Sequence, residues 1–277
     1  MTPPPLLLVD GHNLLYRSWY GFPTRILSRD KSEDRTGVFG FVALLRKAQR
    51  LHAAGHELFV VFDAENGADA RVAQDSDYKA NRAVETDAGL IGSLKDIKTA
   101  LDHAEVRWIE HDGCEADDVI ATLATLARRE LRPVDVMSAD KDFLQLLDDP
   151  HVRVLNTMLA EHRRYSAGPD VLARYGVSAA QWPDYRALTG DPSDHIAGVR
   201  GIGPKTAVRL LVGGRTLEQI PTEEIRPAWA GQWDQAARWR EMIRLDRKVD
   251  LPDELLTATV TDPLLPAPAV LEVLGLW

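Results

Sequence analysis

Short apolar segments alternate along the first part of the chain with segments whose apolar residues recur every three or four positions. The apolar segments have the length and composition of buried strands. We expect strands at 6–9, 58–62, 106–109, 134–137 and 152–155. The three- and four-residue spacing is typical of amphipathic helices. We expect helices around 38–48, 90–101 and 115–126, with Thr86 as the N-cap of the second. Strands that alternate with helices predict an α/β fold with a mostly parallel central sheet flanked by helices.

The pattern changes after about residue 168. Short helical segments there are joined by turns rich in glycine and proline, as in "YRALTGDPSDHIAGVRGIGPKTAVRLL". We therefore divide the chain into an α/β core over 1–168 and a C-terminal helical lobe over 169–277. Within the core, the segment from Ala64 to Glu85 is polar, long and without clear periodicity. Such segments are typically functional lids or partly disordered loops.

Acidic residues follow the expected strands at four separate places. One follows the first strand, one the second and two the fourth, and a group of three opens the helix after the third. They are Asp10, Asp63, Asp140 and Asp142, and Glu115, Asp117 and Asp118 in "GCEADDVI". In a parallel sheet these positions lie along one edge, at the carboxyl ends of the strands. Helix capping explains any single acid at such a position, but it does not account for acids at four strand ends.

Like charges held this close together cost free energy unless a cation neutralises them. Hard oxygen ligands without accompanying cysteines suit Mg²⁺ or Mn²⁺ rather than structural zinc. Carboxylates spread over several strand ends can hold two such ions roughly 4 Å apart, the arrangement used for phosphodiester hydrolysis by an activated water. His12, His111 and His195 lie near the acids in sequence, so a histidine ligand stays open. Cys114 adjoins the cluster, and a lone cysteine is typically a small buried side chain.

The glycine-rich stretch "GVRGIGPKT", from Gly198 to Thr206, comes close to a phosphate-binding P-loop. Its glycines, lysine and threonine nearly fit the pattern GxxxxGK[ST], but Pro204 interrupts the pattern and no strand precedes it. The stretch instead predicts a hairpin between two helices. The backbone N–H groups of such a hairpin and the N-terminus of the following helix grip a phosphate of duplex DNA without reading bases.

Six motifs of the chain occur in the order and spacing found in a known family. They are "VDGHNLLYRSWYG", "FDA", "YKANR", "GCEADDVIATLA", "SADKDFLQLL" and "LTGDPSDHIAGVRGIGPKTA". On these motifs the chain resembles the bacterial 5′-3′ exonucleases over about residues 5–250. This family includes the N-terminal domain of DNA polymerase I and its free-standing relatives, within the wider flap endonuclease group. The resemblance implies a PIN-like 5′ nuclease core with a helical arch within 64–105, and a helix-hairpin-helix element near 186–212 in the lobe.

The resemblance also implies two groups of acids that bind Mg²⁺ or Mn²⁺, some of them through water. The nearer group comprises Asp10, Asp63, Glu115, Asp117 and Asp140, with Asp118 as an additional member, and the farther group comprises Asp142, Asp191 and Asp194. Tyr78, Lys79 and Arg82 match the stretch at the base of the arch, through which a free 5′ end passes. Lys79 is then expected to neutralise charge on the scissile phosphate, with Arg82 beside it. The residues alone are equally consistent with solvated loop charges.

The glycine hairpin matches the helix-hairpin-helix element of the family, which often binds K⁺ through backbone carbonyls while it holds duplex phosphate. The resemblance implies DNA contacts by Arg71 in the arch and by Arg200, Gly201, Gly203, Lys205, Thr206 and Arg209 in this element. The chain departs from the family in "SDHIAGV", where His195 replaces asparagine and Ala197 replaces proline. In the arch, Ala70 replaces an aromatic residue and the proline that often follows "NR" is absent. These departures leave substrate threading and preference open.

The formal net charge of -9 argues at first against a nucleic-acid partner. Nine acids belong to the predicted site, however, and removing them from the 42 Asp and Glu residues leaves 33, equal to the 33 Lys and Arg residues. Arginines and a lysine surround the hairpin, where duplex DNA should dock. A single cysteine fits a reducing interior, and no apolar run is long enough for a membrane span. The N-terminus lacks the basic region of a secretory signal, so we expect a cytoplasmic protein.

The sequence thus predicts a metal-dependent 5′ nuclease that hydrolyses DNA at a free or flapped 5′ end beside duplex, as an exonuclease, a flap endonuclease or both. We expect a monomer that works with a DNA polymerase and a ligase in replication and repair. The chain ends at Trp277 without polymerase sequence, so it is either free-standing or an excised domain. One alternative is a related PIN-like ribonuclease, although such domains are usually shorter and lack the glycine hairpin. Another is a non-catalytic duplex DNA-binding scaffold, but an unused acidic cluster would only destabilise the fold.

Overall fold

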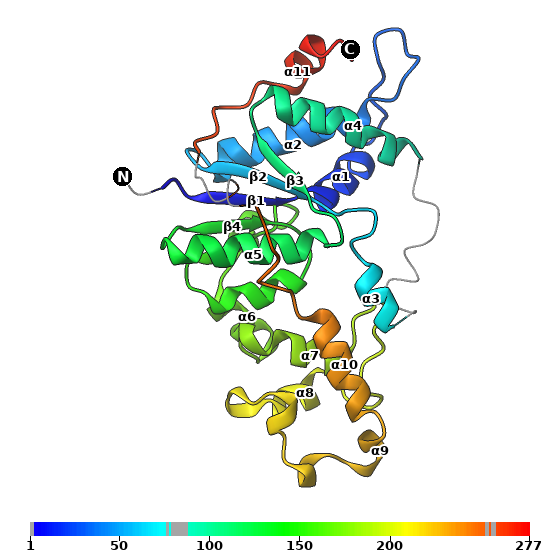
Figure 1. Cartoon of the computed structure of the whole chain (residues 1–277), viewed down its shortest axis with the longest axis vertical. Coiled ribbons are helices and arrows are strands. Elements are labelled where there is room, and N and C mark those ends of the chain that lie inside the picture. Colours follow the sequence, from blue (N-terminus) through cyan, green and yellow to red (C-terminus); the bar gives the residue numbers. More distant parts are fainter. Residues whose placement is uncertain (1–2, 76–77, 79–87, 253–254, 256–258) are drawn as a thin grey trace.

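A six-stranded sheet lies at the centre of the protein (Figure 1). The computed structural model describes residues 3–75, 78, 88–252, 255 and 259–277. The strands are β1 (Leu6–Asp10), β2 (Glu57–Phe62), β3 (Arg107–Glu110), β4 (Val134–Met137), β5 (Val152–Leu155) and β6 (Tyr165–Ser166), in the order β3-β2-β1-β4-β5-β6. The first five are parallel, and β6 is antiparallel to β5. The predicted mostly parallel sheet is confirmed; β6 is too short to give a sequence pattern.

The sheet is covered on both faces, because successive side chains of a strand point to opposite sides. In β1, Leu7 and Val9 enter the core of one face, whereas Leu6 and Leu8 enter the core of the other. The first face carries α1 (Gly11–Tyr20), α2 (Thr36–His52), α4 (Ala88–His103) and α11 (Ala267–Val273), and the second carries α5 (Ala116–Arg129). Burial on both faces explains why the central strands read as continuous apolar runs. The three expected core helices are α2, α4 and α5; Thr86 lies outside the described residues.

The helical lobe packs on the α5 side of the sheet and extends away from it (Figure 1). Its α-helices are α6 (Gly168–Tyr175), α7 (Trp182–Thr189), α8 (Pro204–Leu210), α9 (Pro227–Ala230) and α10 (Trp233–Ile243). Short 3-10 helices are η2 (Asp142–Asp148), η3 (Glu161–Arg163), η4 (Ala179–Gln181), η5 (Val212–Gly214), η6 (Leu217–Gln219) and η7 (Thr222–Glu224). The fully buried Trp182 of α7 anchors the lobe in the same apolar core as α5. None of the helices in the described part of the chain is long and apolar enough to span a membrane.

The end of the chain leaves the lobe and returns to the α/β body, which differs from the expected division at 169–277. The Leu58 N–H donates to the Thr261 hydroxyl at 2.8 Å, and the Gln49 side chain holds the backbone of Asp262 and Leu264. Leu271 of α11 is fully buried against α2. Which body the C-terminal segment covers depends on contacts with distant parts of the chain, which no local sequence pattern shows.

A short helix, α3 (Asp69–Gln74), lies in the polar segment for which the sequence shows no clear periodicity. It begins the predicted arch, and α4 follows on the other side. Residues 76–77 and 79–87, with Lys79 and Arg82 among them, lie outside the described residues. The structure therefore describes both flanks of the arch and Tyr78 between them.

Candidate metal centre

The strand-end acids lie on one edge of the sheet, where its winding reverses. β1 is paired with β2 on one side and with β4 on the other, and such a reversal opens a crevice at the carboxyl ends of the strands. Asp10 ends β1, Asp63 follows β2, and Asp140 lies in the loop after β4. The charges of Asp63 and Asp140 both act on Asp10. The fold therefore gathers acids from three strands at this crevice.

Asp10 is a helix cap and a member of the acidic cluster at the same time. Its Oδ1 accepts the Asn13 N–H at 2.9 Å, which caps α1, and its Oδ2 accepts the Ser138 hydroxyl at 2.8 Å. Burial, with the charges of Asp63 and Asp140, raises the pKa of Asp10 to about 7 despite these two hydrogen bonds. Capping thus occurs, but the site disfavours the charged carboxylate.

Gly11 allows α1 to approach the end of β2. A Cβ at this position would lie 2.5 Å from the Phe62 ring, so a larger residue would push the two elements apart. The approach places His12 beside Asp63, whose N–H donates to His12 Nδ1 at 3.0 Å. The same Nδ1 lies 3.2 Å from Asp63 Oδ2, and burial lowers the pKa of His12. Asp63 Oδ1 in turn accepts the Ala116 N–H at 2.8 Å, which ties β2 to the start of α5.

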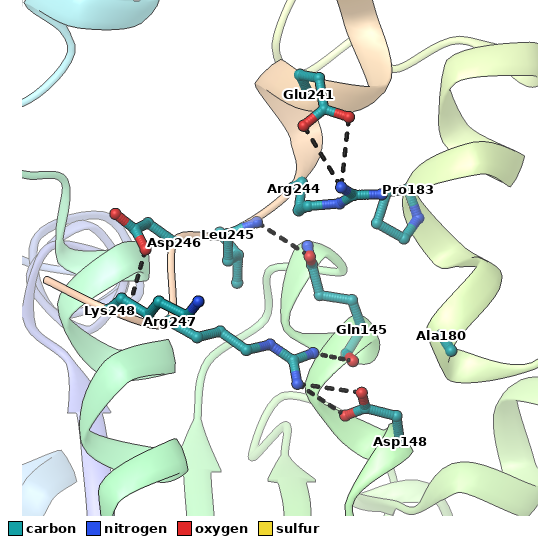
Figure 2. A pocket seen from close by; sticks show the side chains of 10 residues that line it. All are labelled: Gln145, Asp148, Ala180, Pro183, Glu241, Arg244, Leu245, Asp246, Arg247 and Lys248. Atoms are coloured by element: carbon teal, nitrogen blue, oxygen red, sulfur yellow. Dashed lines mark hydrogen bonds and ion pairs between the residues drawn. The ribbon is translucent and has the colours of Figure 1, made fainter. Parts of the chain in front are cut away.

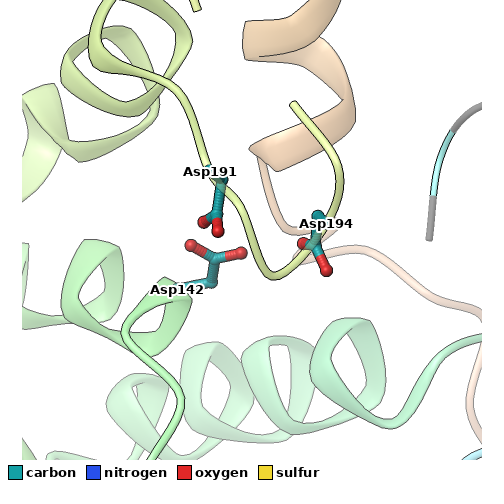
Figure 3. Close-up of side chains that lie close together, drawn as sticks. All are labelled: Asp142, Asp191 and Asp194. Atoms are coloured by element: carbon teal, nitrogen blue, oxygen red, sulfur yellow. The ribbon is translucent and has the colours of Figure 1, made fainter. Parts of the chain in front are cut away.

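Asp142, Asp191 and Asp194 form a second group of acids (Figure 3). Each offers a carboxylate oxygen within 4.8 Å of the other two, and the residues are only 6%, 3% and 6% exposed. Asp142 begins η2, and the other two belong to the loop between α7 and α8. Within the described part of the chain, no other three His, Cys, Asp or Glu residues meet in this way. The structure therefore brings together the three acids of the predicted farther group.

The loop that carries these two lobe aspartates is closed by backbone hydrogen bonds of 2.7 and 2.8 Å between Asp191 and Ile196. His195 has a φ of 62°, in the left-handed region that asparagine, aspartate and histidine enter more readily than other side chains. Gly198 has a φ of 72°, and a Cβ there would lie 2.4 Å from the Gly190 nitrogen. His195 stands where the exonuclease family that the motifs resemble has asparagine. Because histidine also enters this backbone region, the replacement leaves the turn intact.

Arg186 of α7 is the cationic partner of the loop. Its Nε donates to Asp191 Oδ2 at 3.0 Å, and its Nη2 makes an ion pair with the same oxygen. Burial alone would raise the pKa of Asp191, but hydrogen bonds from Ser193 and Arg186, together with the arginine charge, lower it below its ordinary value. Asp191 is therefore held ionised and oriented.

Asp142 is in the opposite electrostatic state. Burial and the charges of Asp140, Asp194 and Asp191 hold the pKa of Asp142 well above its usual range, and Arg186 only partly offsets them. A divalent cation would remove this repulsion, and carboxylate oxygens are the ligands that Mg²⁺ and Mn²⁺ prefer. The residues present therefore fit a divalent metal ion.

An arginine from another helix lies against the acids of "GCEADDVI". Arg71 of α3 donates to both oxygens of Asp118, at 2.9 and 2.8 Å, and also to Glu115 Oε2. The Tyr78 hydroxyl donates to the same Glu115 oxygen at 3.2 Å. Asp117 is half-buried beside them. Arg71, predicted as a DNA contact, is thus placed among the acids, with only 13% of its side chain exposed.

The other predicted residues are more dispersed. Lys79 and Arg82 lie outside the described residues, so their roles stay predictions. In the glycine hairpin the predicted DNA contacts are exposed, except for Thr206, which is half-buried. The exposed ones are Arg200, Gly201, Gly203, Lys205 and Arg209. Gly203 is the N-cap of α8, as expected for a turn that leads into a helix.

A separate pocket of about 560 Å³ lies between η2, the start of α7 and the segment after α10 (Figure 2). Arg247 Nη1 contacts both carboxylate oxygens of Asp148, at 3.1 and 3.0 Å, and Arg244 Nη1 lies 3.4 Å from Glu241. The charges facing this pocket are therefore largely balanced by neighbours, and the pocket adds no ligand to the acidic site.

Sequence reasoning did not single out Arg186 or Ser138. An arginine on a short helix normally indicates a surface charge, and a serine after a strand indicates a turn. The only signal for either residue is its proximity to a motif, "LTGDPSD" for Arg186 and "SADKD" for Ser138.

Two family models together cover almost the whole chain. The model described as 5′-3′ exonuclease, N-terminal resolvase-like domain, matches residues 5–176, and the model described as 5′-3′ exonuclease, C-terminal SAM fold, matches residues 177–264. The chain belongs to the 5′-3′ exonuclease family. The resemblance seen in the sequence motifs is thereby confirmed.

Curated relatives of this 5′-3′ exonuclease are DNA polymerases I. That of Deinococcus radiodurans is 39% identical over 219 residues, which are 79% of this chain and 22% of the relative. The thermostable enzyme of Thermus thermophilus is 37% identical over 258 residues, which are 90% of this chain and 29% of the relative. The chain thus spans less than a third of the length of these relatives.

Two solved structures share the fold over nearly their whole length. The T5 5′-exonuclease with bound divalent zinc ions has a TM-score of 0.68 at 20% identity, covering 97% of this chain and 99% of that one. The T5 D15 flap endonuclease, in a pseudo-enzyme-product complex with DNA and metal ions, has a TM-score of 0.68 at 21% identity, covering 98% and 99%. At this identity the likeness establishes the fold alone, an α/β core with a helical lobe.

The metal-free exonuclease is expected to lose thermal stability as the pH rises from about 5 to about 7.5. The pKa of Asp10 is about 7 in the folded protein and 3.8 in the reference state, so the native state holds a proton that the unfolded chain has released. This contribution to stability is lost as the pH rises through the folded pKa. Calorimetric melting in EDTA across this pH range measures the loss of stability. The difference between wild type and Asp10→Asn isolates Asp10 from His12, whose lowered pKa acts in the opposite direction.

Millimolar Mn²⁺ should raise the Tm by about 5–10 °C at pH 8, as for a ligand near a hundredfold above its Kd. The shift should be smaller at pH 6, because protons compete with the metal for the same carboxylates. An unchanged Tm at both pH values would contradict an assembled metal site.

Proposed function

We propose that the protein is a metal-dependent, structure-specific 5′ nuclease that hydrolyses DNA phosphodiester bonds at or near a free or flapped 5′ end. The observation that carries this proposal is the buried group Asp142, Asp191 and Asp194, with ligand oxygens within 4.8 Å of one another in a chain of the 5′-3′ exonuclease family. A buried set of acids is costly without a cation. The group is therefore best explained as a metal site.

In this proposal the acids divide between two ions. Asp142, Asp191 and Asp194 hold one, and Asp10, Asp63, Glu115, Asp117 and Asp140 hold the other. Mg²⁺ or Mn²⁺ bound there supplies a Lewis acid for the phosphate charge and lowers the pKa of a bound water. The chain itself contributes the orientation of the carboxylates. Ser138 holds Asp10 and Arg186 holds Asp191, as partners behind metal ligands usually do.

The arch segment supplies the groups that face the phosphate. We propose that Lys79 and Arg82 offset the charge that develops on the scissile phosphate. Tyr78 has a different role in this scheme. Burial and the charges of Asp194 and Glu115 raise the pKa of Tyr78, so its hydroxyl stays protonated and acts as a hydrogen-bond donor, not as a base.

The glycine hairpin is proposed to hold the duplex beside the 5′ end. The exposed Arg200, Lys205 and Arg209 are suited to phosphate contacts that carry no sequence information. K⁺ at this hairpin is part of the proposal. Because such contacts release counterions from DNA, duplex affinity should fall steeply as salt increases.

The cellular setting is also a proposal. The relatives are DNA polymerases I, which supports work beside a DNA polymerase, and with a ligase, in replication and repair. We propose a monomer in the cytoplasm. The matched share of these relatives is compatible with either a free-standing enzyme or one part of a longer chain.

The proposal is tested with 5′-labelled flap, nicked-duplex and single-stranded DNA, and with RNA versions of each, in Mn²⁺, in Mg²⁺ and in EDTA. We expect metal-dependent cutting near the 5′ junction of the DNA flap. The relative cleavage rates of the flap, nicked-duplex and single-stranded substrates then show whether flap or exonuclease activity dominates. Cutting confined to RNA would favour a PIN-like ribonuclease. Duplex binding without cutting in either metal would favour a scaffold and overturn the proposal.

A further inference from the structure

Every nitrogen of the Arg71 guanidinium group donates to another part of the protein. Nε donates to the Met242 carbonyl at 3.0 Å, Nη2 to Asp118, and Nη1 to both Asp118 and Glu115. The two-pronged contact with Asp118 is the arrangement in which an arginine orients a carboxylate most strongly. Because only 13% of the side chain is exposed and all three guanidinium nitrogens already donate hydrogen bonds, a DNA phosphate would have to compete with this pair.

Asp118 has little capacity left for a metal. Its Oδ1 accepts hydrogen bonds from Arg71 at 2.8 Å and from the Asp246 N–H at 2.8 Å, and its Oδ2 accepts from Arg71 at 2.9 Å. A carboxylate offers about four acceptor positions, so most are already taken. Direct binding of an ion by Asp118 would leave the Arg71 charge buried without its main partner, which is strongly unfavourable.

The Arg71–Asp118 pair joins three parts of the molecule. Arg71 lies on α3, at the start of the arch, and Asp118 lies in the first turn of α5. Both residues also bind backbone groups at the end of α10 and in the segment that follows it, at Met242 and Asp246 respectively. The same segment forms a wall of the pocket in Figure 2. The pair thus fastens the arch to the nuclease core and to the helical lobe.

The arch segment that this pair holds in place also contacts Glu115. Arg71 Nη1 and the Tyr78 hydroxyl both donate to Glu115 Oε2, and both come from the arch segment. Glu115 is 4% exposed at the N-cap of α5, and its side chain makes no capping hydrogen bond there. Two side chains of the arch segment therefore help to orient the carboxylate of a proposed metal ligand.

We propose that Asp118 is a positioning residue and not a metal ligand: together with Arg71 it orients the Glu115 carboxylate for metal binding and couples the arch to the metal site. This inference rests on the proposed nuclease function. It also assigns Arg71 to the same pair and not to DNA. Asp118, which was predicted as an additional metal ligand, and Arg71, which was predicted as a DNA contact of the arch, thus form one structural unit.

The test compares Arg71→Met, Arg71→Lys, Asp118→Asn and the Arg71→Met/Asp118→Asn double variant with wild type, and uses Glu115→Gln as the ligand reference. Turnover and KM are measured on 5′-flap DNA, and affinity for Mn²⁺ alone is measured by calorimetry. We expect kcat to fall about tenfold to a hundredfold in each single variant with KM nearly unchanged. The double variant should be no worse than the worse single one, because both changes remove the same pair. Arg71→Lys should recover only part of the rate, since lysine cannot make the two-pronged contact.

Arg128→Met is the matched control, because it removes an arginine of α5 whose side chain is 61% exposed and paired with Asp149 at 3.1 Å. All variants are assayed at temperatures at which circular dichroism shows them folded. If Asp118→Asn loses as much Mn²⁺ affinity as Glu115→Gln while Arg71→Met gains affinity, Asp118 is a ligand and the proposal fails. If Arg71→Met raises KM and leaves kcat intact, Arg71 is a DNA contact. If wild type does not cut DNA, the nuclease proposal itself fails, and the Mn²⁺ titrations still decide between the two roles of Asp118.

Discussion

Replacing Asp142 with asparagine is expected to reduce metal-dependent cleavage of 5′-flap DNA by at least about 10³-fold. The amide keeps the size of the side chain and an oxygen that can accept the Trp182 Nε1–H, which lies 3.4 Å from Asp142 Oδ1. It removes one of three buried charges, however, and a neutral amide is a weaker ligand for a hard divalent ion. The stabilisation that a bound metal gives to phosphate charge is several kcal/mol, and each 1.36 kcal/mol is tenfold in rate.

The metal-free stability of the same variant separates a lost site from a lost fold. Because burial and the neighbouring acids hold the pKa of Asp142 above its usual range, Asp142→Asn should keep or raise the Tm in EDTA at pH 8. The rise in Tm on adding Mn²⁺ should shrink. Asp148→Asn, at the exposed end of the same helix η2, is the matched control and should cut normally. Wild-type rates in Asp142→Asn would remove this group from the mechanism.

Replacing Lys79 with alanine should lower kcat about 10²- to 10³-fold and change duplex affinity little. A preorganised cation that meets charge only as the transition state develops contributes to turnover and not to ground-state binding. The hydroxyl of Tyr78, the residue before Lys79 in the sequence, donates to Glu115, so Tyr78 itself belongs to the acidic site. Single-turnover cleavage and DNA binding in Ca²⁺, measured on the same flap, give the two quantities.

Lys95→Ala is the matched control for this prediction, because it removes an exposed lysine of α4 on the other flank of the arch. It should leave both turnover and affinity unchanged. Losses of equal size in kcat/KM and in affinity for Lys79→Ala would instead make Lys79 a docking residue, and the phosphate charge would then need another cation.

The sheet and its helices follow from patterns that can be read over a few residues. Apolar runs such as "LLLV" and "LFVVF" are long enough to cross a sheet buried on both faces, and the spacing in α2 and α5 gives each helix one apolar side. The acids at strand ends also follow from the pattern, because parallel strands end on the same edge. The two-residue β6, the short α3 and the packing of α11 on α2 do not, since each depends on contacts with distant segments.

The acidic site was likewise predictable from the sequence in part only. Position in the motifs is sufficient to select Asp142, Asp191 and Asp194, and the structure brings their oxygens within 4.8 Å. No local pattern indicates that Arg71 would pair with Asp118, because 47 residues separate them. The family resemblance predicted Arg71 as a DNA contact of the arch, which the low exposure of its side chain, 13%, does not support.

Strand and helix identity, the order of the motifs and the family are therefore accessible from the chain as written, because backbone periodicity and motif spacing are local properties. The state of each charge is not. Whether a carboxylate faces a metal, an arginine or water depends on which side chains packing brings within a few ångströms and on how far water is excluded. For this reason three aspartates that look alike in the sequence differ in the folded protein. Burial and neighbouring acids disfavour the charged form of Asp142, whereas Arg186 holds Asp191 ionised and Arg71 pairs with Asp118.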